Sequence, residues 1–239
     1  SMIRMIGNQF NTQFVDSETT QNTSLGVAYQ VIAPAKYQTI QMPTSVEQNV
    51  PGYTIYGVFF IMQTIATSLF RERNDGTFRR IQAAPLSRAV FLTGKMLPYY
   101  LINLVQITLM FTVGVVVFKM SLGRDPLALV VLSLATAAAA TGLGLLITTL
   151  GKTIEQVSSL STLLSVVLAA VGGSMVPIFV MPKFMQTAAF ITPHAWALTG
   201  FQDVIVRGQG LSAVLPITWI LMAYALVFWG VAVWRFKYE

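Results

Sequence analysis

Five long stretches without a charged residue constrain this chain more than any other feature of its sequence. They cover residues 48–70, 96–118, 126–151, 156–182 and 208–234, and they consist mainly of Leu, Val, Ile, Ala and Phe. A helix needs roughly 20 residues to cross a hydrocarbon core about 30 Å thick. Each stretch is long enough. The sequence therefore predicts an all-α, polytopic helical membrane protein with about five visible spans.

Composition excludes several other classes of protein. Only 10% of the residues are charged and 54% are hydrophobic, whereas soluble domains carry roughly 25% charged residues. The net charge of +6 fits the positive-inside bias of membrane proteins, so the expected partner is the lipid bilayer and not nucleic acid. With no cysteine and one histidine, we expect no disulfide, no thiol catalysis and no metal site.

A sixth uncharged stretch, residues 184–202, has a different character. Pro193, His194 and Gly200 interrupt it midway. It could span the membrane, but two short half-helices re-entering the outer leaflet fit better. Irregular backbone at membrane depth needs protein or a water-filled cavity to cover it.

Basic residues predict the orientation of the spans. The first loop, 71–95, is the richest in them, with Arg71, Arg73, Arg79, Arg80, Arg88 and Lys95. Cytoplasmic loops carry such an excess, so we expect this loop and the C-terminus in the cytoplasm and residues 1–47 outside. The expected location is the inner (plasma) membrane, with multiple passes. The polar residues 1–47 have no export signal before them, and this predicts at least one span preceding Ser1.

The predicted spans contain no Asp, Glu, Lys or Arg. Ion-coupled transporters usually hold such groups near the midplane, so this absence weakens a secondary-transporter function. The polar residues that remain are uncharged. Hydrogen bonds between helices, worth about 0.6–2 kcal/mol each, are the favoured explanation, and a weakly polar substrate path is the alternative. The candidate path residues are Gln63, Thr67, Asn103, Gln106, Ser158, Thr162 and Ser165.

Small residues predict close helix contacts and one helix end. The pairs Ala138/Gly142 and Ala140/Gly144 have the small-xxx-small spacing that lets backbones approach closely. Gly172-Gly173 should end the fourth span or form a hinge in it.

Two motifs resemble functional sites but lack residues that those sites require. Gly151-Lys152-Thr153 resembles the end of a phosphate-binding loop, but Leu146 stands where that loop needs glycine and a membrane helix precedes it. His194 has no nucleophile elbow to serve, so a structural hydrogen-bonding function is favoured over catalysis. We therefore expect no catalytic residue in this chain.

The loop after the first span carries the functional signal. A turn at Asp75-Gly76 leads to a predicted short helix over 77–84, with Thr77 as N-cap and Pro85 as its stop. Phe78, Ile81 and Leu86 share its apolar side. This element could present itself to a partner at the membrane interface, or it could be a positive loop that only sets topology.

The motif Glu72…Gly76-Thr77…Arg80…Pro85-Leu86-Ser87-Arg88…Gly94-Lys95, preceded by Val50-Pro51-Gly52, resembles the type-2 ABC exporter permeases. These are membrane subunits of daunorubicin-resistance-like and related multidrug or antibiotic exporters. The resemblance covers residues 50–239 and implies six spans, of which five are visible here. It also implies an external segment over 1–49, a permease domain over 50–239 and short external helices near Pro193.

The resemblance further implies a partner ATPase that binds ATP and Mg²⁺, and a second permease copy in a homodimer or paralogous heterodimer. The loop 71–95 would be the coupling element, through Glu72, Arg73, Gly76, Thr77, Phe78, Arg79, Arg80, Ile81, Pro85, Leu86 and Arg88. The expected function is efflux of an amphipathic or hydrophobic substrate driven by ATP hydrolysis in the partner. A channel, a secondary transporter and, less favoured, an intramembrane enzyme are the alternatives.

Overall fold

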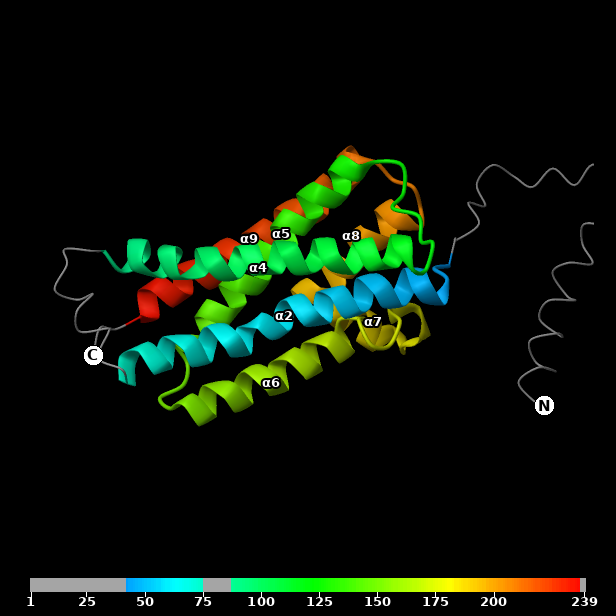
Figure 1. Ribbon diagram of the computed structural model, residues 1–239. Coiled ribbons are helices and arrows are strands. Elements are labelled where there is room, and N and C mark those ends of the chain that lie inside the picture. The colour runs from blue at the N-terminus through cyan, green and yellow to red at the C-terminus, as the bar shows by residue number, and fades with distance from the viewer. Residues whose placement is uncertain (1–41, 75–86, 237–239) are drawn as a thin grey trace, which may run out of the picture. The chain divides into compact units, whose positions relative to one another are not determined.

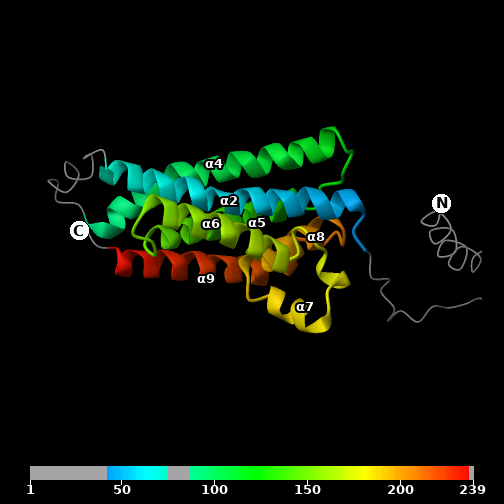
Figure 2. The same cartoon turned by 90° about the horizontal axis from the view of Figure 1, so that it is seen from below.

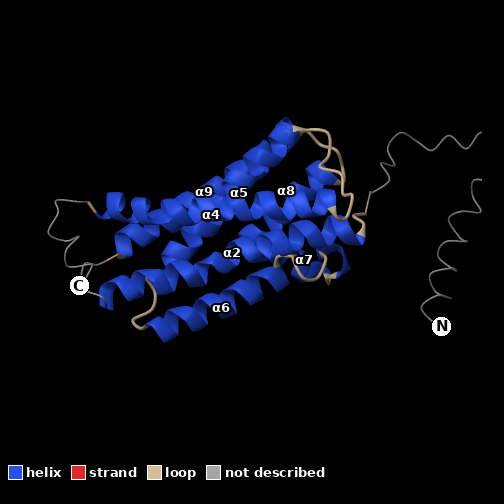
Figure 3. Cartoon of the chain, viewed as in Figure 1, coloured by secondary structure: helices blue, strands red, loops and turns tan. Residues whose placement is uncertain are grey.

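The chain folds into a bundle of helices. The computed structural model describes residues 42–74 and 87–236, which belong to the compact unit Gln41–Glu239. These residues form helices joined by loops and turns (Figure 3). The elements are α2 (Ser45–Asn74), α4 (Arg88–Val116), α5 (Pro126–Thr148), α6 (Ile154–Val171), η1 (Ile178–Val180), α7 (Lys183–Ala189), α8 (Pro193–Ile205) and α9 (Leu211–Arg235).

Within the described ranges, five helices are long and apolar enough to cross a membrane. They are α2 up to Glu72, and the whole of α4, α5, α6 and α9. Large apolar side chains such as Val105, Leu163 and Val227 are exposed on their outer surfaces, as contact with lipid requires. The predicted all-α, polytopic membrane fold is confirmed.

Two helices have bounds that differ most from those of the uncharged stretches. α4 begins at Arg88, because Ser87 caps it by accepting a hydrogen bond from the Val90 amide at 3.3 Å. α6 ends at Val171, because Gly172 forms its C-cap and Gly173 has φ +90°. Gly172-Gly173 therefore ends the helix, as one of the two interpretations predicted.

Residues 184–202 form parts of two short helices, α7 and α8, and not one span. The Thr192 hydroxyl accepts a hydrogen bond from the Ala195 amide at 3.3 Å, and Pro193 occupies the first turn. These two residues start α8 sharply after the turn that ends α7. The predicted pair of short helices is confirmed.

Helix α5 occupies the centre of the bundle, between α2 and α9 (Figures 1 and 2). The most apolar window of α5 is 67% buried, against 22% in α4 and in α6. Two glycines allow this close approach. A Cβ at Gly142 would lie 3.1 Å from the Ala225 carbonyl oxygen of α9, and a Cβ at Gly144 would lie 2.7 Å from Ile65 Cδ1 of α2.

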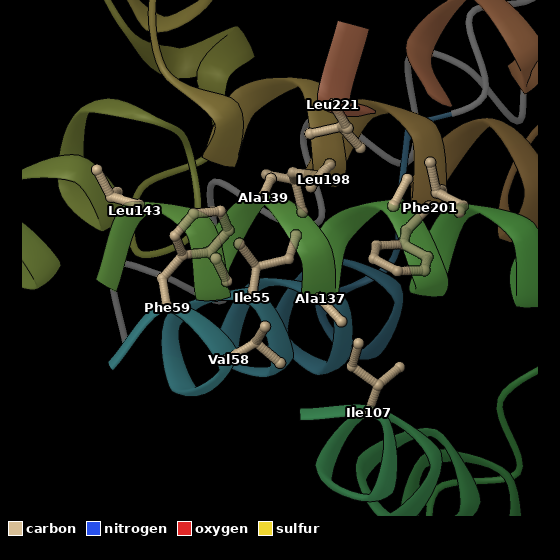
Figure 4. Close-up of a cluster of buried hydrophobic side chains, with 14 of the residues drawn as sticks. Ile55, Val58, Phe59, Ile107, Ala137, Ala139, Leu143, Leu198, Phe201 and Leu221 are labelled. Carbon is tan, nitrogen blue, oxygen red and sulfur yellow. The ribbon is translucent and has the colours of Figure 1, made fainter. Parts of the chain in front are cut away.

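The core forms where α2, α5 and α8 meet (Figure 4). Phe59 from α2 and Phe201 from α8 are among the largest completely buried side chains. Small side chains of α5, such as Ala137 and Ala139, leave the space that these rings fill.

Polar contacts tie the helix ends together at the end of the bundle where α9 begins. Asp125 Oδ1 accepts hydrogen bonds from the amides of Leu127 and Ala128, and its Oδ2 accepts one from the Leu211 amide at 2.8 Å. One carboxylate therefore caps both α5 and α9. At the same end, Gln48 of α2 donates to the Gly173 carbonyl at 3.0 Å.

Candidate functional site

The predicted coupling loop lies between α2 and α4. Of its eleven predicted residues, Glu72 ends the apolar part of α2 and Arg88 begins α4. Arg73 belongs to α2, and its side chain is outside the described residues. The others also lie outside them: Gly76, Thr77, Phe78, Arg79, Arg80, Ile81, Pro85 and Leu86. Their assignment to a coupling surface remains a prediction.

The two helix ends that flank this loop are joined within the chain. The Glu72 carboxylate forms an ion pair with Lys95 Nζ, which links α2 to α4. Arg88 Nη1 donates a hydrogen bond to the Phe236 carbonyl at 3.0 Å, which links the start of α4 to the end of α9. Three helices are therefore fixed to one another where the loop leaves the bundle.

Sequence reasoning did not anticipate these links. Lys95 was predicted as a topology-setting charge, and Phe236 was not singled out at all. The Glu72–Lys95 ion pair joins residues 23 positions apart, and the Arg88–Phe236 bond joins residues 148 apart. A signal was present only for the first, since Glu72 is one of two acids beside six bases in this loop and is expected to pair with one of them.

Two of the candidate path residues meet at the contact between α2 and α6, and two others lie one turn away from it. Gln63 Nε2 donates to Ser158 Oγ at 3.1 Å. Thr67 lies one turn along α2 and bonds to the Gln63 carbonyl, and Thr162 lies one turn along α6 with its side chain exposed. We call these four residues the polar seam.

The remaining candidates lie elsewhere. Asn103 is buried and donates to Thr141 of α5 at 3.4 Å, which is the interhelical bond that the packing explanation predicts. Gln106 lines a separate hollow of about 330 Å³ between α2 and α4. Ser165 is buried and donates to the Ser161 carbonyl of its own helix. The structure thus brings two of the seven candidates, Gln63 and Ser158, into contact across helices.

His194 is completely buried in α8, outside the five candidate spans. Its ring lies 3.9 Å from the Phe59 ring, centroid to centroid, and neither ring nitrogen has a hydrogen-bond partner in the described part of the chain. Burial lowers the pKa of His194 to about 3. The ring therefore packs as a neutral aromatic group and does not make the hydrogen bond that the sequence suggested.

The turn Gly151-Lys152-Thr153 joins α5 to α6. The Thr153 hydroxyl accepts a hydrogen bond from the Gln156 amide at 3.2 Å and so caps α6. A helix precedes this turn where a phosphate-binding loop requires a strand. The resemblance to that loop was correctly rejected.

Comparison with known proteins agrees with this architecture. The family described as ABC-2 family transporter protein matches residues 1–234. The linearmycin resistance permease protein LnrN of Bacillus subtilis (strain 168) is 30% identical over 176 residues, which cover 74% of this chain and 46% of LnrN. The putative transport permease YvfS of the same organism is 25% identical over 204 residues, covering 77% of this chain and 78% of YvfS.

The inner membrane transport permease YhhJ of Escherichia coli (strain K12) is 26% identical over 173 residues, covering 72% of this chain and 46% of YhhJ. The matched region thus spans about half the length of LnrN and of YhhJ. The family match extends over nearly the whole chain, and the five candidate spans agree with the resemblance found from the sequence. This chain belongs to the ABC-2 transporter family, and the relatives that it matches are named as permeases.

Proposed function

We propose that this permease exports an amphipathic or hydrophobic compound and that a separate cytoplasmic ATPase supplies the energy. The family makes the chain a transport component, and the ATPase, the direction and the substrate are the proposed parts. One relative is named a linearmycin resistance permease, and resistance of that kind supports export of an antibiotic-like compound.

The main support for this proposal is that the helix ends on both sides of the loop are linked to other helices. Glu72 pairs with Lys95, and Arg88 bonds to the Phe236 carbonyl, so both ends of the loop are fixed to the bundle. A force applied to a loop with free ends would bend the loop alone. With both ends fixed, the same force moves α2 and α4 together.

Helix α2 extends this movement to the polar seam. It has 30 residues and is therefore about 45 Å long. Glu72 and Gln63 lie on the same helix, roughly 13 Å apart along its axis. A displacement at the loop therefore displaces Gln63 against Ser158 of α6, and that contact is where we propose a substrate passes.

A second permease copy would cover the outer face of α6. Ser159 and Thr162 are exposed on that face, and Glu155 is exposed in the first turn of α6. Polar side chains inside a membrane normally face protein or a water-filled cavity and not lipid. A partner copy facing α6 would enclose a weakly polar path between the two permeases.

Reconstitution with an ABC ATPase that co-purifies with this permease tests the proposal. Arg79, Arg80 and Ile81 are replaced together by Ala, and ATP hydrolysis and export of a fluorescent amphipathic dye are measured in proteoliposomes. We expect hydrolysis to continue while export is lost. The matched control replaces Lys119 and Lys183, which are exposed far from the loop, and should leave export intact. Unchanged export in the triple variant, or conductance without nucleotide, would contradict the proposal.

A further inference from the structure

A pocket of about 510 Å³ opens at the end of the bundle that carries the loop between α2 and α4. The ends of α2, α5 and α9 and the turn before α6 enclose it, and these ends lie together on the side marked C in Figure 1. Its volume is within the 300–1,000 Å³ usual for small-ligand sites. The polar seam does not use this pocket, and the proposed coupling contacts share only Phe236 with it, through the carbonyl that accepts from Arg88.

Two cations line this pocket from distant parts of the chain. Lys152 comes from the turn between α5 and α6, and Arg235 ends α9. Among the described residues, no carboxylate forms an ion pair with either side chain. Glu72, at the same end of the bundle, pairs with Lys95 instead. Glu155 is the acid nearest to Lys152 in the sequence and does not line the pocket. Within the described ranges 42–74 and 87–236, the pocket therefore presents two positive charges with no paired carboxylate.

Two carbonyl oxygens at the end of α5 are hydrogen-bonded within the helix end. The last carbonyls of a helix carry partial negative charge and would repel an anion. Here the Thr148 hydroxyl donates to the Leu145 carbonyl at 2.6 Å, and the Thr149 hydroxyl donates to the Leu146 carbonyl at 2.7 Å. These two carbonyls are hydrogen-bonded, which reduces the negative partial charge that the end of α5 presents beside Lys152.

The other walls of the pocket are apolar and lie at the membrane boundary. Leu69 and Phe70 of α2 face it, and Trp234 of α9 is 79% exposed beside Arg235. Tryptophan at the end of a span marks the interface between headgroups and acyl chains. A soluble anion gains nothing from such walls, whereas a lipid places its phosphate at the cations and its glycerol and upper acyl chains against the apolar residues.

We propose that this pocket binds the headgroup of an anionic glycerophospholipid. Lys152 and Arg235 contact the phosphate, and Leu69, Phe70 and Trp234 contact the glycerol and the first acyl carbons. Basic pockets between membrane helices are suited to anionic headgroups. Bound there, the lipid bridges α2, α5 and α9 beside the links that hold the loop ends, and it would stabilise their arrangement.

Native mass spectrometry of the full chain in detergent tests this site. Phosphatidylglycerol and phosphatidylcholine with the same acyl chains are titrated separately, and dissociation constants are obtained from the lipid-bound species. We expect phosphatidylglycerol to bind at least tenfold more tightly. Each cation near a membrane surface is worth about fivefold in affinity, so Lys152→Gln with Arg235→Gln should weaken phosphatidylglycerol roughly 25-fold.

The matched control is Lys119→Gln with Lys183→Gln, which removes the same charge from exposed positions at the other end of the bundle. It should leave the affinity unchanged. Trp234→Ala should weaken phosphatidylglycerol while both cations remain. Equal affinity for the two lipids, or equal losses in the two double variants, would overturn the proposal. Displacement of the lipid by inorganic phosphate or ATP at similar concentration would also overturn it, because the site would then take soluble anions.

Discussion

Asp125 joins the first turns of α5 and α9, so replacing it should destabilise both helices at once. Its Oδ1 accepts from the Leu127 amide at 3.1 Å and the Ala128 amide at 3.3 Å. Its Oδ2 accepts from the Leu211 amide at 2.8 Å, across 86 positions of sequence. These amides lie in or at the edge of first turns, where no helical carbonyl can satisfy them.

The cost of removing this carboxylate can be added up from its contacts. Losing the N-cap of α5 costs about 1 kcal/mol. Losing the bond from the Leu211 amide to a charged oxygen costs about 1.5 kcal/mol, the low end for a group at the surface. Losing the negative charge beside two helix N-termini costs about 0.5 kcal/mol more. We expect Asp125→Ala to lower the free energy of unfolding by about 3 kcal/mol.

Asp125→Asn separates the parts of this sum. Asparagine keeps one acceptor oxygen for α5, but its amide nitrogen cannot accept from the Leu211 amide, and the charge is gone. We expect this variant to lower the free energy of unfolding by about 2 kcal/mol. Thermal unfolding in detergent should show Tm falling by about 6–12 °C for Ala and by about two-thirds of that for Asn.

Asp203→Ala is the control for this prediction. Asp203 pairs with Arg207 one turn away on the protein surface, and such a pair is worth about 0.3–0.5 kcal/mol. Its Tm should therefore change little. Two results would contradict the calculation. One is a Tm of Asp125→Ala no lower than that of Asp203→Ala, and the other is a Tm of Asp125→Asn equal to that of the wild type.

Three further predictions follow from helix packing, the loop ends and His194. Gly144→Val should cost about 1–3 kcal/mol, because the new side chain would push α2 away, whereas Gly230→Val meets no atom within 4 Å and should be nearly neutral. Lys95→Glu should reduce export by placing two carboxylates together, and Glu72→Lys in the same chain should restore it. Acidification should destabilise the protein through His194, whose pKa is about 3 when folded against an ordinary histidine value of 6.5 when unfolded. Above pH 6.5 the ring is neutral in both states, and between pH 6.5 and 3 only the unfolded state takes the proton, so stability falls by about 1.4 kcal/mol per pH unit.

Each of these predictions has a measurement that can contradict it. Equal melting temperatures for Gly144→Val and Gly230→Val would exclude a tight contact between α5 and α2. Export that stays lost in the exchanged Glu72/Lys95 pair would show that the ion pair does not control coupling. His194→Phe should keep the stacking on Phe59 and flatten the dependence of Tm on pH between about 7 and 5. An unchanged slope in that variant would assign the pH dependence to other groups.

Much of the fold was predictable from local sequence. The spans follow from charge spacing, because charged side chains are costly within a bilayer. The end of α6 at Gly172 and the start of α8 at Pro193 follow from backbone preferences of single residues. The resemblance to type-2 permeases also depends on residues close together in the loop between two spans. All these features involve neighbours in the chain.

Only the tertiary structure decided which helix is central and which polar groups meet. α5 and α9 have equal hydropathy, yet the apolar window of α5 is 67% buried and that of α9 28%. Lipid is as apolar as a leucine side chain, so hydropathy cannot distinguish a helix that faces lipid from one that faces protein. Gly142 and Gly144 let α9 and α2 approach α5 closely, and α5 is therefore buried by protein. The Glu72–Lys95 and Asp125–Leu211 contacts likewise depend on where separate helices end in space. The sequence by itself determined how many times the chain can cross a membrane, and side-chain packing decided what each crossing contacts.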